Sequence, residues 1–312
     1  MFELLINLIL TGLFLQSQAE QQATLNNLSQ AEYQLPRSAV SRLEETAPQR
    51  DFNSQSLGVK ITAQSALVID VETDKILFEK NPQAVRSIAS ITKLMTALVF
   101  LDYKPDLNKE IIMVRGDYRT GGKNYLMAGD QIKFIDVLYA ALVASANEAA
   151  AALARSTGLS ESDFAKAMAK KAADLNMANT HFTDATGLNN DNVSTATDII
   201  ILLKAALEKP VIAQIISSKE YKFLVTNKGV ERKITNTDKI LGQTFGIGAD
   251  TYRVDGGKTG YIEKAGYGFA SQVSNQDGKK ILIAVLGSES LDSRFTDTKS
   301  LAYWVFNNYN WR

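Results

Sequence analysis

A serine and a lysine lie three positions apart in the segment Ser90-Ile91-Thr92-Lys93. On a helix, positions i and i+3 share a face, so the lysine amine can reach the serine hydroxyl. A serine hydroxyl becomes a strong nucleophile when a base takes its proton, and lysine can be that base if its ammonium form is destabilised. The apolar residues that follow predict a buried helix from Ser90 to Leu101, which would lower the pKa of Lys93. The pair therefore indicates serine acyl transfer, although Ser-x-x-Lys alone is a common pattern.

A second polar group interrupts an Ala-rich helical block at Ser145-Ala146-Asn147. In an active site, Ser145 would be suited to relaying a proton and Asn147 to holding a substrate amide. The same residue types also favour a cap or turn between two helices, and taken alone they are more typical of that structure.

A third group is the glycine-rich segment Asp255-Gly256-Gly257-Lys258-Thr259-Gly260-Tyr261, at the start of a predicted strand. Glycine lets another backbone approach closely, as recognition of a peptide by strand addition requires. Lys258 and Thr259 would then bind a carboxylate. The alternative is a glycine-rich turn ahead of an edge strand.

The hydrophobic pattern indicates which elements must position these groups. Strands are predicted in a hairpin at 65–71 and 76–78, and again at 259–273 and 280–286. Helices are predicted in an Ala- and Leu-rich block over 131–176, at 197–207 up to Pro210, and at 297–308. This order predicts an α/β chain whose sheet, mixed or antiparallel, is completed from both chain ends around an inserted helical block.

The composition excludes several classes of site. The 312 residues include no cysteine and one histidine, His181, so we expect no thiolate or histidine metal centre and no cofactor. Lys plus Arg and Asp plus Glu number 34 each, so nothing indicates a nucleic-acid partner or an anionic membrane surface.

The N-terminal region predicts export. An apolar run of 12 residues, Leu4 to Leu15, precedes Ser17-Gln18-Ala19, which is typical of a signal peptide over 1–19. The region carries no Lys or Arg before the apolar run, and the alternatives are an amphiphilic N-terminal tail or a misassigned start. Residues 20–57 are rich in Gln, Asn, Ser and Glu and predict a flexible polar leader, followed by a catalytic domain over 58–312. We therefore expect a periplasmic or other extracytoplasmic protein with no stable membrane span after cleavage.

Taken together and in this order, the three groups resemble the motif set of penicillin-binding proteins. The chain is similar, from about Ile61 to its end, to the low-molecular-mass penicillin-binding proteins, the D-alanyl-D-alanine carboxypeptidases and endopeptidases. Further similar segments are Thr186-Gly187-Leu188 and Ser194-Thr195-Ala196-Thr197-Asp198. The resemblance implies the penicillin-binding/β-lactamase-like transpeptidase fold, an α/β fold of the α+β type. In it, an antiparallel sheet is flanked by helices and carries an inserted all-helical subdomain.

The resemblance also implies a mechanism. Ser90 would attack the carbonyl of a D-Ala-D-X bond in a peptidoglycan stem peptide, with Lys93 as the base. Ser145 would pass the proton to the leaving amine, and Asn147 would orient the substrate.

The remaining implied roles lie on the glycine-rich strand. Lys258 and Thr259 would receive the terminal carboxylate, and Gly260 would let the strand pair with the peptide. The backbone N–H groups of Ser90 and Tyr261 would bind the oxyanion. β-Lactams would be covalent inhibitors, and the biological role would be in peptidoglycan biosynthesis, cell-wall organisation and cell shape.

Three alternatives accompany the carboxypeptidase prediction. The short segment after Gly260 resembles the endopeptidase branch, which cuts D-Ala cross-links. A class A β-lactamase is disfavoured because Ala172 stands where its deacylating Glu belongs. A catalytically silent peptidoglycan-binding module on the same fold is the third alternative.

Overall fold

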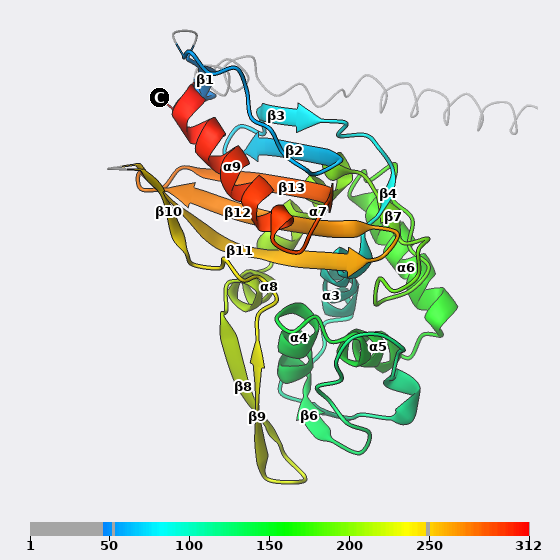
Figure 1. Ribbon diagram of the computed structural model, residues 1–312. Coiled ribbons are helices and arrows are strands. Elements are labelled where there is room, and N and C mark those ends of the chain that lie inside the picture. Colours follow the sequence, from blue (N-terminus) through cyan, green and yellow to red (C-terminus); the bar gives the residue numbers. More distant parts are fainter. Residues whose placement is uncertain (1–45, 52–53, 248–249, 312) are drawn as a thin grey trace, which may run out of the picture. The chain divides into compact units, whose positions relative to one another are not determined.

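Figure 1 shows the computed structural model, which describes residues 46–51, 54–247 and 250–311. One compact unit extends from Pro48 to the C-terminus. The predicted signal peptide, 1–19, lies outside the described residues, as does most of the predicted leader. The described end of that leader joins the compact unit, where strand β1 (Gln49–Arg50) pairs with β14 (Tyr309–Asn310).

The central element is a six-stranded sheet in the order β10-β11-β12-β13-β2-β3, in which every neighbouring pair is antiparallel. The predicted sheet is confirmed, and because β13 pairs with β2, both ends of the chain complete it. The strands are β2 (Ser65–Asp70), β3 (Ile76–Lys80), β10 (Thr244–Ile247), β11 (Asp250–Ile262), β12 (Gly266–Asn275) and β13 (Lys280–Ser288).

The prediction of one strand over 259–273 is wrong. The chain turns at residues 263–265, so that β11 and β12 form a hairpin. The turn ends at Gly266, whose φ of 68° is a conformation that glycine adopts without strain. Exposed Glu263 and Lys264 at the turn are the sequence signal that the apolar pattern concealed.

Both faces of the sheet are covered, which explains the continuous apolar runs in its central strands. Along β2, Leu67 and Ile69 enter one hydrophobic core, whereas Ala66 and Val68 enter a second core on the opposite face. Helix α9 (Ser293–Asn308) closes the second core, as Figure 1 shows. The first core contains the helices that carry the candidate site.

The predicted helical block at 131–176 contains three helices, α4 (Phe134–Leu142), α5 (Asn147–Ser156) and α6 (Glu161–Asp174), but its first three residues form a strand, β6 (Gln131–Lys133). Helix α3 (Thr92–Asp102), preceded by the 3-10 turn η1 (Ala89–Ile91), is buried from Thr92 through Phe100. It runs through the first core among these helices and α7 (Ala196–Leu207). Helix α7 ends at Leu207, as predicted, and Pro210 begins the next helix, α8 (Pro210–Ile216), because a proline in the first helical turn loses no intrahelical hydrogen bond.

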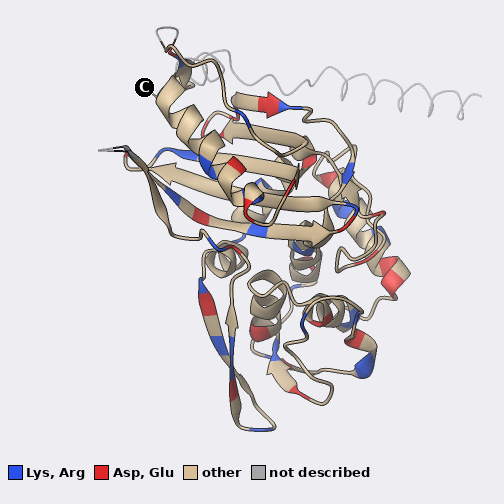
Figure 2. Cartoon of the chain, in the orientation of Figure 1, with Lys and Arg blue, Asp and Glu red and all other residues tan. Residues whose placement is uncertain are grey.

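Short antiparallel pairs complete the unit. The sequence did not predict the hairpin of β8 (Glu220–Val225) and β9 (Val230–Thr235), whose charges alternate in Figure 2 and include the ion pair Lys222–Glu231. The other pairs are β4 (Arg86–Ser87) with β7 (Val193–Ser194) and β5 (Glu110–Ile112) with β6 (Gln131–Lys133); the 3-10 turn η2 (Arg115–Asp117) follows β5. In the described part of the chain, no helix has the length and apolar character needed to cross a membrane.

Candidate active site

Ser90 and Lys93 lie at the junction of η1 and α3. Ser90 is half-buried in η1, and Lys93 is in the first turn of α3 with a side chain that has no exposed surface. The Lys93 Nζ lies 2.9 Å from the Ser90 Oγ. The one-turn spacing predicted from the sequence therefore places an amine beside the hydroxyl.

A loop packs closely against this junction because it has a glycine, Gly187, at the point of contact. Gly187 has a φ of 82°, and a Cβ there would lie 2.0 Å from the carbonyl oxygen of Ala89. The preceding residue, Thr186, presents its backbone carbonyl to Lys93 Nζ at 2.7 Å. Gly187 thus brings this carbonyl to the site.

Lys93 has two further partners besides the serine. Its Nζ donates to the Asn147 Oδ1 at 2.7 Å and to the Thr186 carbonyl, and both of these atoms are acceptors only. A neutral amine has two N–H groups and one lone pair. With both N–H groups used on these acceptors, the lone pair faces the hydroxyl of Ser90. In this arrangement a neutral Lys93 would be able to accept the proton of Ser90.

Burial supports the neutral form of Lys93. Loss of hydration lowers the pKa of Lys93 to about 7, while the carboxylates of Asp184 and Glu148 oppose that shift. The predicted lowering by burial agrees with this result. The sequence analysis did not predict that Asp184 and Glu148 lie near Lys93.

Ser145 lies between α4 and α5, which confirms the turn between two helices that its residue type favours. Its φ of 58° would interrupt a right-handed helix. Ser145 Oγ accepts a hydrogen bond from Lys258 Nζ at 2.8 Å. Asn147 follows as the first residue of α5, and its Nδ2 donates to the Gly121 carbonyl at 2.9 Å.

Strand β11 brings Lys258, Thr259 and Gly260 to the site. Lys258 is almost fully buried and also donates to the Thr259 carbonyl at 3.0 Å. Burial, and then the positive charges of Lys93 and Arg294, hold the pKa of Lys258 well below its usual value. The Thr259 hydroxyl shares a 2.7 Å hydrogen bond with the Thr237 hydroxyl.

Gly260 sets the distance between β11 and the serine. A Cβ at Gly260 would lie 2.5 Å from the Ile88 carbonyl oxygen and 3.2 Å from Ile91 Cγ1, on either side of Ser90. Only glycine therefore allows this close approach. Tyr261, the next residue, is 51% exposed and stacks on Tyr267 with ring centroids 4.3 Å apart.

Arg294 in α9 is a further charged residue that the sequence analysis missed. Its Nη1 donates to the Gly260 carbonyl at 3.3 Å, and its guanidinium lies 5.6 Å from the ring centroid of Tyr267. Burial lowers its pKa to about 10, and burial raises the pKa of nearby Asp238 to about 6. No sequence pattern links α9 to β11, because only the fold places them together.

Within the described residues, no group of three or more acidic or histidine side chains could hold a metal ion. His181, the single histidine, is exposed and forms a backbone bridge with Val193. It makes none of the contacts described above.

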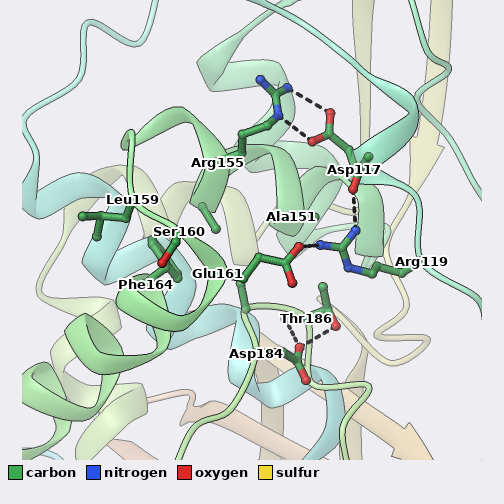
Figure 3. Close-up of a pocket in the computed structure, with 13 residues that line it drawn as sticks. Asp117, Arg119, Ala151, Arg155, Leu159, Ser160, Glu161, Phe164, Asp184 and Thr186 are labelled. Atoms are coloured by element: carbon green, nitrogen blue, oxygen red, sulfur yellow. Dashed lines mark hydrogen bonds and ion pairs between the residues drawn. The ribbon is translucent and has the colours of Figure 1, made fainter.

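A cavity of about 220 Å³ adjoins the segment that holds Lys93, and Figure 3 shows its lining. Thr186 contributes to this lining. Two ion pairs border the cavity, Arg119 with Glu161 and Arg155 with Asp117. They connect η2 to α5 and the loop after η2 to α6.

Comparison with known proteins identifies the family. The profile of the D-alanyl-D-alanine carboxypeptidase family matches residues 49–290. The chain belongs to this family. It is 31% identical over 248 residues to a D-alanyl-D-alanine endopeptidase of Escherichia coli and 33% identical over 248 residues to one of Pseudomonas aeruginosa. Each match covers 79% of this chain and 78% of the relative.

A solved structure supports the family assignment. Penicillin-binding protein D2 from Listeria monocytogenes, in its cefotaxime-bound form, is 30% identical and aligns with a TM-score of 0.68. The alignment covers 80% of this chain and 100% of that one. The predicted penicillin-binding fold is therefore confirmed, and family membership makes the chain a serine-type D,D-peptidase.

Proposed function

We propose that the protein hydrolyses D-Ala-D-X bonds in peptidoglycan stem peptides through an acyl-enzyme on Ser90. The observation that carries this proposal is the set of contacts around Lys93. Two acceptors occupy its N–H groups, and Ser90 lies 2.9 Å away on the remaining side. A neutral amine held in this way can take the serine proton as the hydroxyl attacks.

Acylation then proceeds in two steps, attack on the carbonyl and cleavage of the C–N bond. Ser90 Oγ bonds to the substrate carbonyl carbon as its proton passes to Lys93, and the N–H groups of Ser90 and Tyr261 bind the oxyanion. The C–N bond breaks, and the proton that Lys93 took passes through Ser145 to the leaving amine. Preorganised oxyanion donors are typically worth about 3–4 kcal/mol each in such sites. Water then hydrolyses the ester and restores Ser90.

Lys258 and Thr259 would bind the carboxylate that follows the scissile bond. Lys258 contacts Ser145 and lacks a counter-charge, because the nearest charged groups, Arg294 and Lys93 when it is protonated, are also positive. A substrate carboxylate would supply that charge and favour the ammonium form of Lys258. Carboxylate binding would therefore strengthen the proton relay at Ser145.

Among D-Ala-D-X substrates, we favour cross-linked peptides. Both curated relatives named above are D-alanyl-D-alanine endopeptidases, and this chain covers 78% of each. Carboxypeptidase action on uncross-linked pentapeptides is the second candidate, favoured by the description of the matching family. Either substrate lies outside the cytoplasm, consistent with the proposed signal peptide at 1–19, the leader at 20–57 and a role in cell-wall organisation and cell shape.

Digestion of purified peptidoglycan by the full-length protein tests the proposal. Mass spectrometry of the products should show cross-linked dimers converted to monomers, with loss of terminal D-Ala as the outcome for a carboxypeptidase. Ser90→Ala should leave the substrate intact. Cleavage by that variant at the wild-type rate would refute the proposed nucleophile.

A further inference from the structure

The residue after Asn147 is a buried acid, Glu148, in the first turn of α5. Its side chain has no exposed surface. One oxygen, Oε1, accepts backbone N–H bonds from Tyr125 at 2.6 Å and from Leu126 at 3.1 Å. Among the described residues, no donor reaches the other oxygen, Oε2. A carboxylate buried with one oxygen unpaired is costly and calls for a physical reason.

Glu148 and Asn147 hold the same loop, residues 114–126. Glu148 holds the end of the loop through two N–H groups, and Asn147 donates to the Gly121 carbonyl in its middle. The other end of the Asn147 amide accepts from Lys93. The position of the loop therefore fixes which way the amide faces, and so which acceptor meets the catalytic amine.

Two ion pairs that do not involve Glu148 also hold the 114–126 loop. Asp117 accepts two hydrogen bonds from Arg155, at 2.7 and 2.9 Å, and one from the Val114 N–H at 2.9 Å. Arg119 pairs with Glu161 at the start of α6, as Figure 3 shows. These contacts order the loop without placing a charge next to Lys93, which makes them matched controls for Glu148.

The charge of Glu148 also acts on Lys93. The charged groups around this amine are Glu148 on α5, Asp184 in the loop before Gly187, and Lys258 on β11. Asp184, which has the larger opposing effect on the pKa of Lys93, accepts hydrogen bonds from the Thr186 hydroxyl and from nearby backbone N–H groups. Among the described residues, the Oε2 of Glu148 has no hydrogen-bond donor, and Glu148 is next in sequence to Asn147, which contacts Lys93.

We propose that Glu148 is a positioning residue for acylation: it fixes the 114–126 loop so that Asn147 faces Lys93, and its carboxylate stabilises the ammonium that forms when Lys93 takes the proton of Ser90. This inference rests on the proposed function of Ser90 and Lys93. Glu148 itself gains and loses no proton in the step. It makes the proton transfer less unfavourable in a site that otherwise disfavours charge.

The test is the pH dependence of acylation by a fluorescent penicillin, measured from pH 5 to 9 on the full-length protein. Glu148→Gln keeps the size of the side chain and one acceptor for the loop but removes the charge. Without that charge the ammonium of Lys93 is less stable, so the acidic limb of the profile should move to lower pH by roughly 1 unit. The plateau rate should fall by roughly tenfold, because the amine becomes a weaker base.

Asp117→Asn is the matched control, since it loosens the same loop from the opposite side. It should lower the rate and leave the acidic limb in place. Glu148→Asp keeps the charge but shortens the reach to Tyr125, so it should also retain the wild-type limb with a reduced rate. If circular dichroism shows that Glu148→Gln does not fold, the test uses Glu148→Asp alone. A wild-type rate of acylation in Glu148→Asp would then overturn the proposal that Glu148 fixes the 114–126 loop.

Two outcomes separate this inference from the proposed function. A folded Glu148→Gln whose acidic limb coincides with that of the wild type, or of Asp117→Asn, would overturn the role of Glu148 and leave Ser90 as the nucleophile. A wild-type protein that forms no acyl-enzyme at all would instead overturn the proposed function.

Discussion

Replacing Gly260 by alanine should separate strand β11 from the nucleophile. The added Cβ would lie 2.5 Å from the Ile88 carbonyl oxygen, where ordinary contact begins near 3.4 Å. Backbone cannot rotate away as a flexible side chain can, so either β11 or the η1 turn must move by about 0.5–0.9 Å. Movement of either one changes the distance between the Tyr261 N–H group and Ser90.

Two consequences of the Gly260→Ala substitution can be measured. Overpacking of this kind typically lowers the free energy of unfolding by about 1–3 kcal/mol, measurable by urea denaturation. A misplacement approaching 1 Å at reacting groups can cost roughly 100-fold in rate. We therefore expect acylation by a fluorescent penicillin to slow by about that factor while most of the protein remains folded.

Gly116→Ala is the control, because its new Cβ would meet only Val114 Cγ2, at 3.9 Å. It should change acylation by less than about twofold and stability by less than about 0.5 kcal/mol. A Gly260→Ala protein that acylates at the wild-type rate would refute the idea that this glycine sets the geometry of the site.

Three further predictions follow from the site and the core. Acylation of the wild type should rise about tenfold per pH unit up to about pH 7 and then level off, because only the neutral amine of Lys93 accepts a proton; a flat stopped-flow profile from pH 5 to 7 would contradict this. Lys258→Ala should lower kcat/KM more than tenfold for peptides with a free C-terminal carboxylate and by a smaller factor for the corresponding amides. Equal losses for both substrates would exclude a role of Lys258 in binding the carboxylate. Phe269→Ala should reduce the free energy of unfolding by about 3–5 kcal/mol in urea titrations, because this fully buried ring packs edge-on against Phe295; a loss below about 1 kcal/mol would contradict that packing.

The sequence was sufficient to predict the groups whose chemistry depends on local spacing. Ser90 and Lys93 lie one helical turn apart, so their contact follows from the pattern alone. The order of strands and helices predicted a mixed or antiparallel sheet, completed from both chain ends around an inserted helical block, and the sheet is antiparallel. The order of the three motifs then indicated the family, which the match over residues 49–290 confirms.

The missing parts of the site depend on contacts between distant segments. Thr186 enters through the backbone of a loop, and its carbonyl would serve equally well on almost any residue type. Arg294 reaches Gly260 from a helix on the other face of the sheet. Glu148 follows Asn147 in the sequence, but its burial and its hydrogen bond with the Tyr125 N–H depend on the folded loop, which the sequence pattern does not predict.

Ser145 shows the limit of periodicity as a guide. The Ala-rich pattern runs through it without a break, yet its positive φ ends one helix and lets its hydroxyl turn toward Lys258. Ser and Asn tolerate such turns, and the sequence contained that signal. That signal favoured a turn between two helices, and the structure places one there.

The most direct test of the account is to locate the covalent adduct formed with a β-lactam. The full-length protein would be incubated with a penicillin at pH 8, digested, and analysed by peptide mass spectrometry. We predict a single adduct on the peptide that contains Ser90, and no adduct in Ser90→Ala. An adduct on any other residue, or full labelling of Ser90→Ala, would contradict the assignment of Ser90 as the nucleophile.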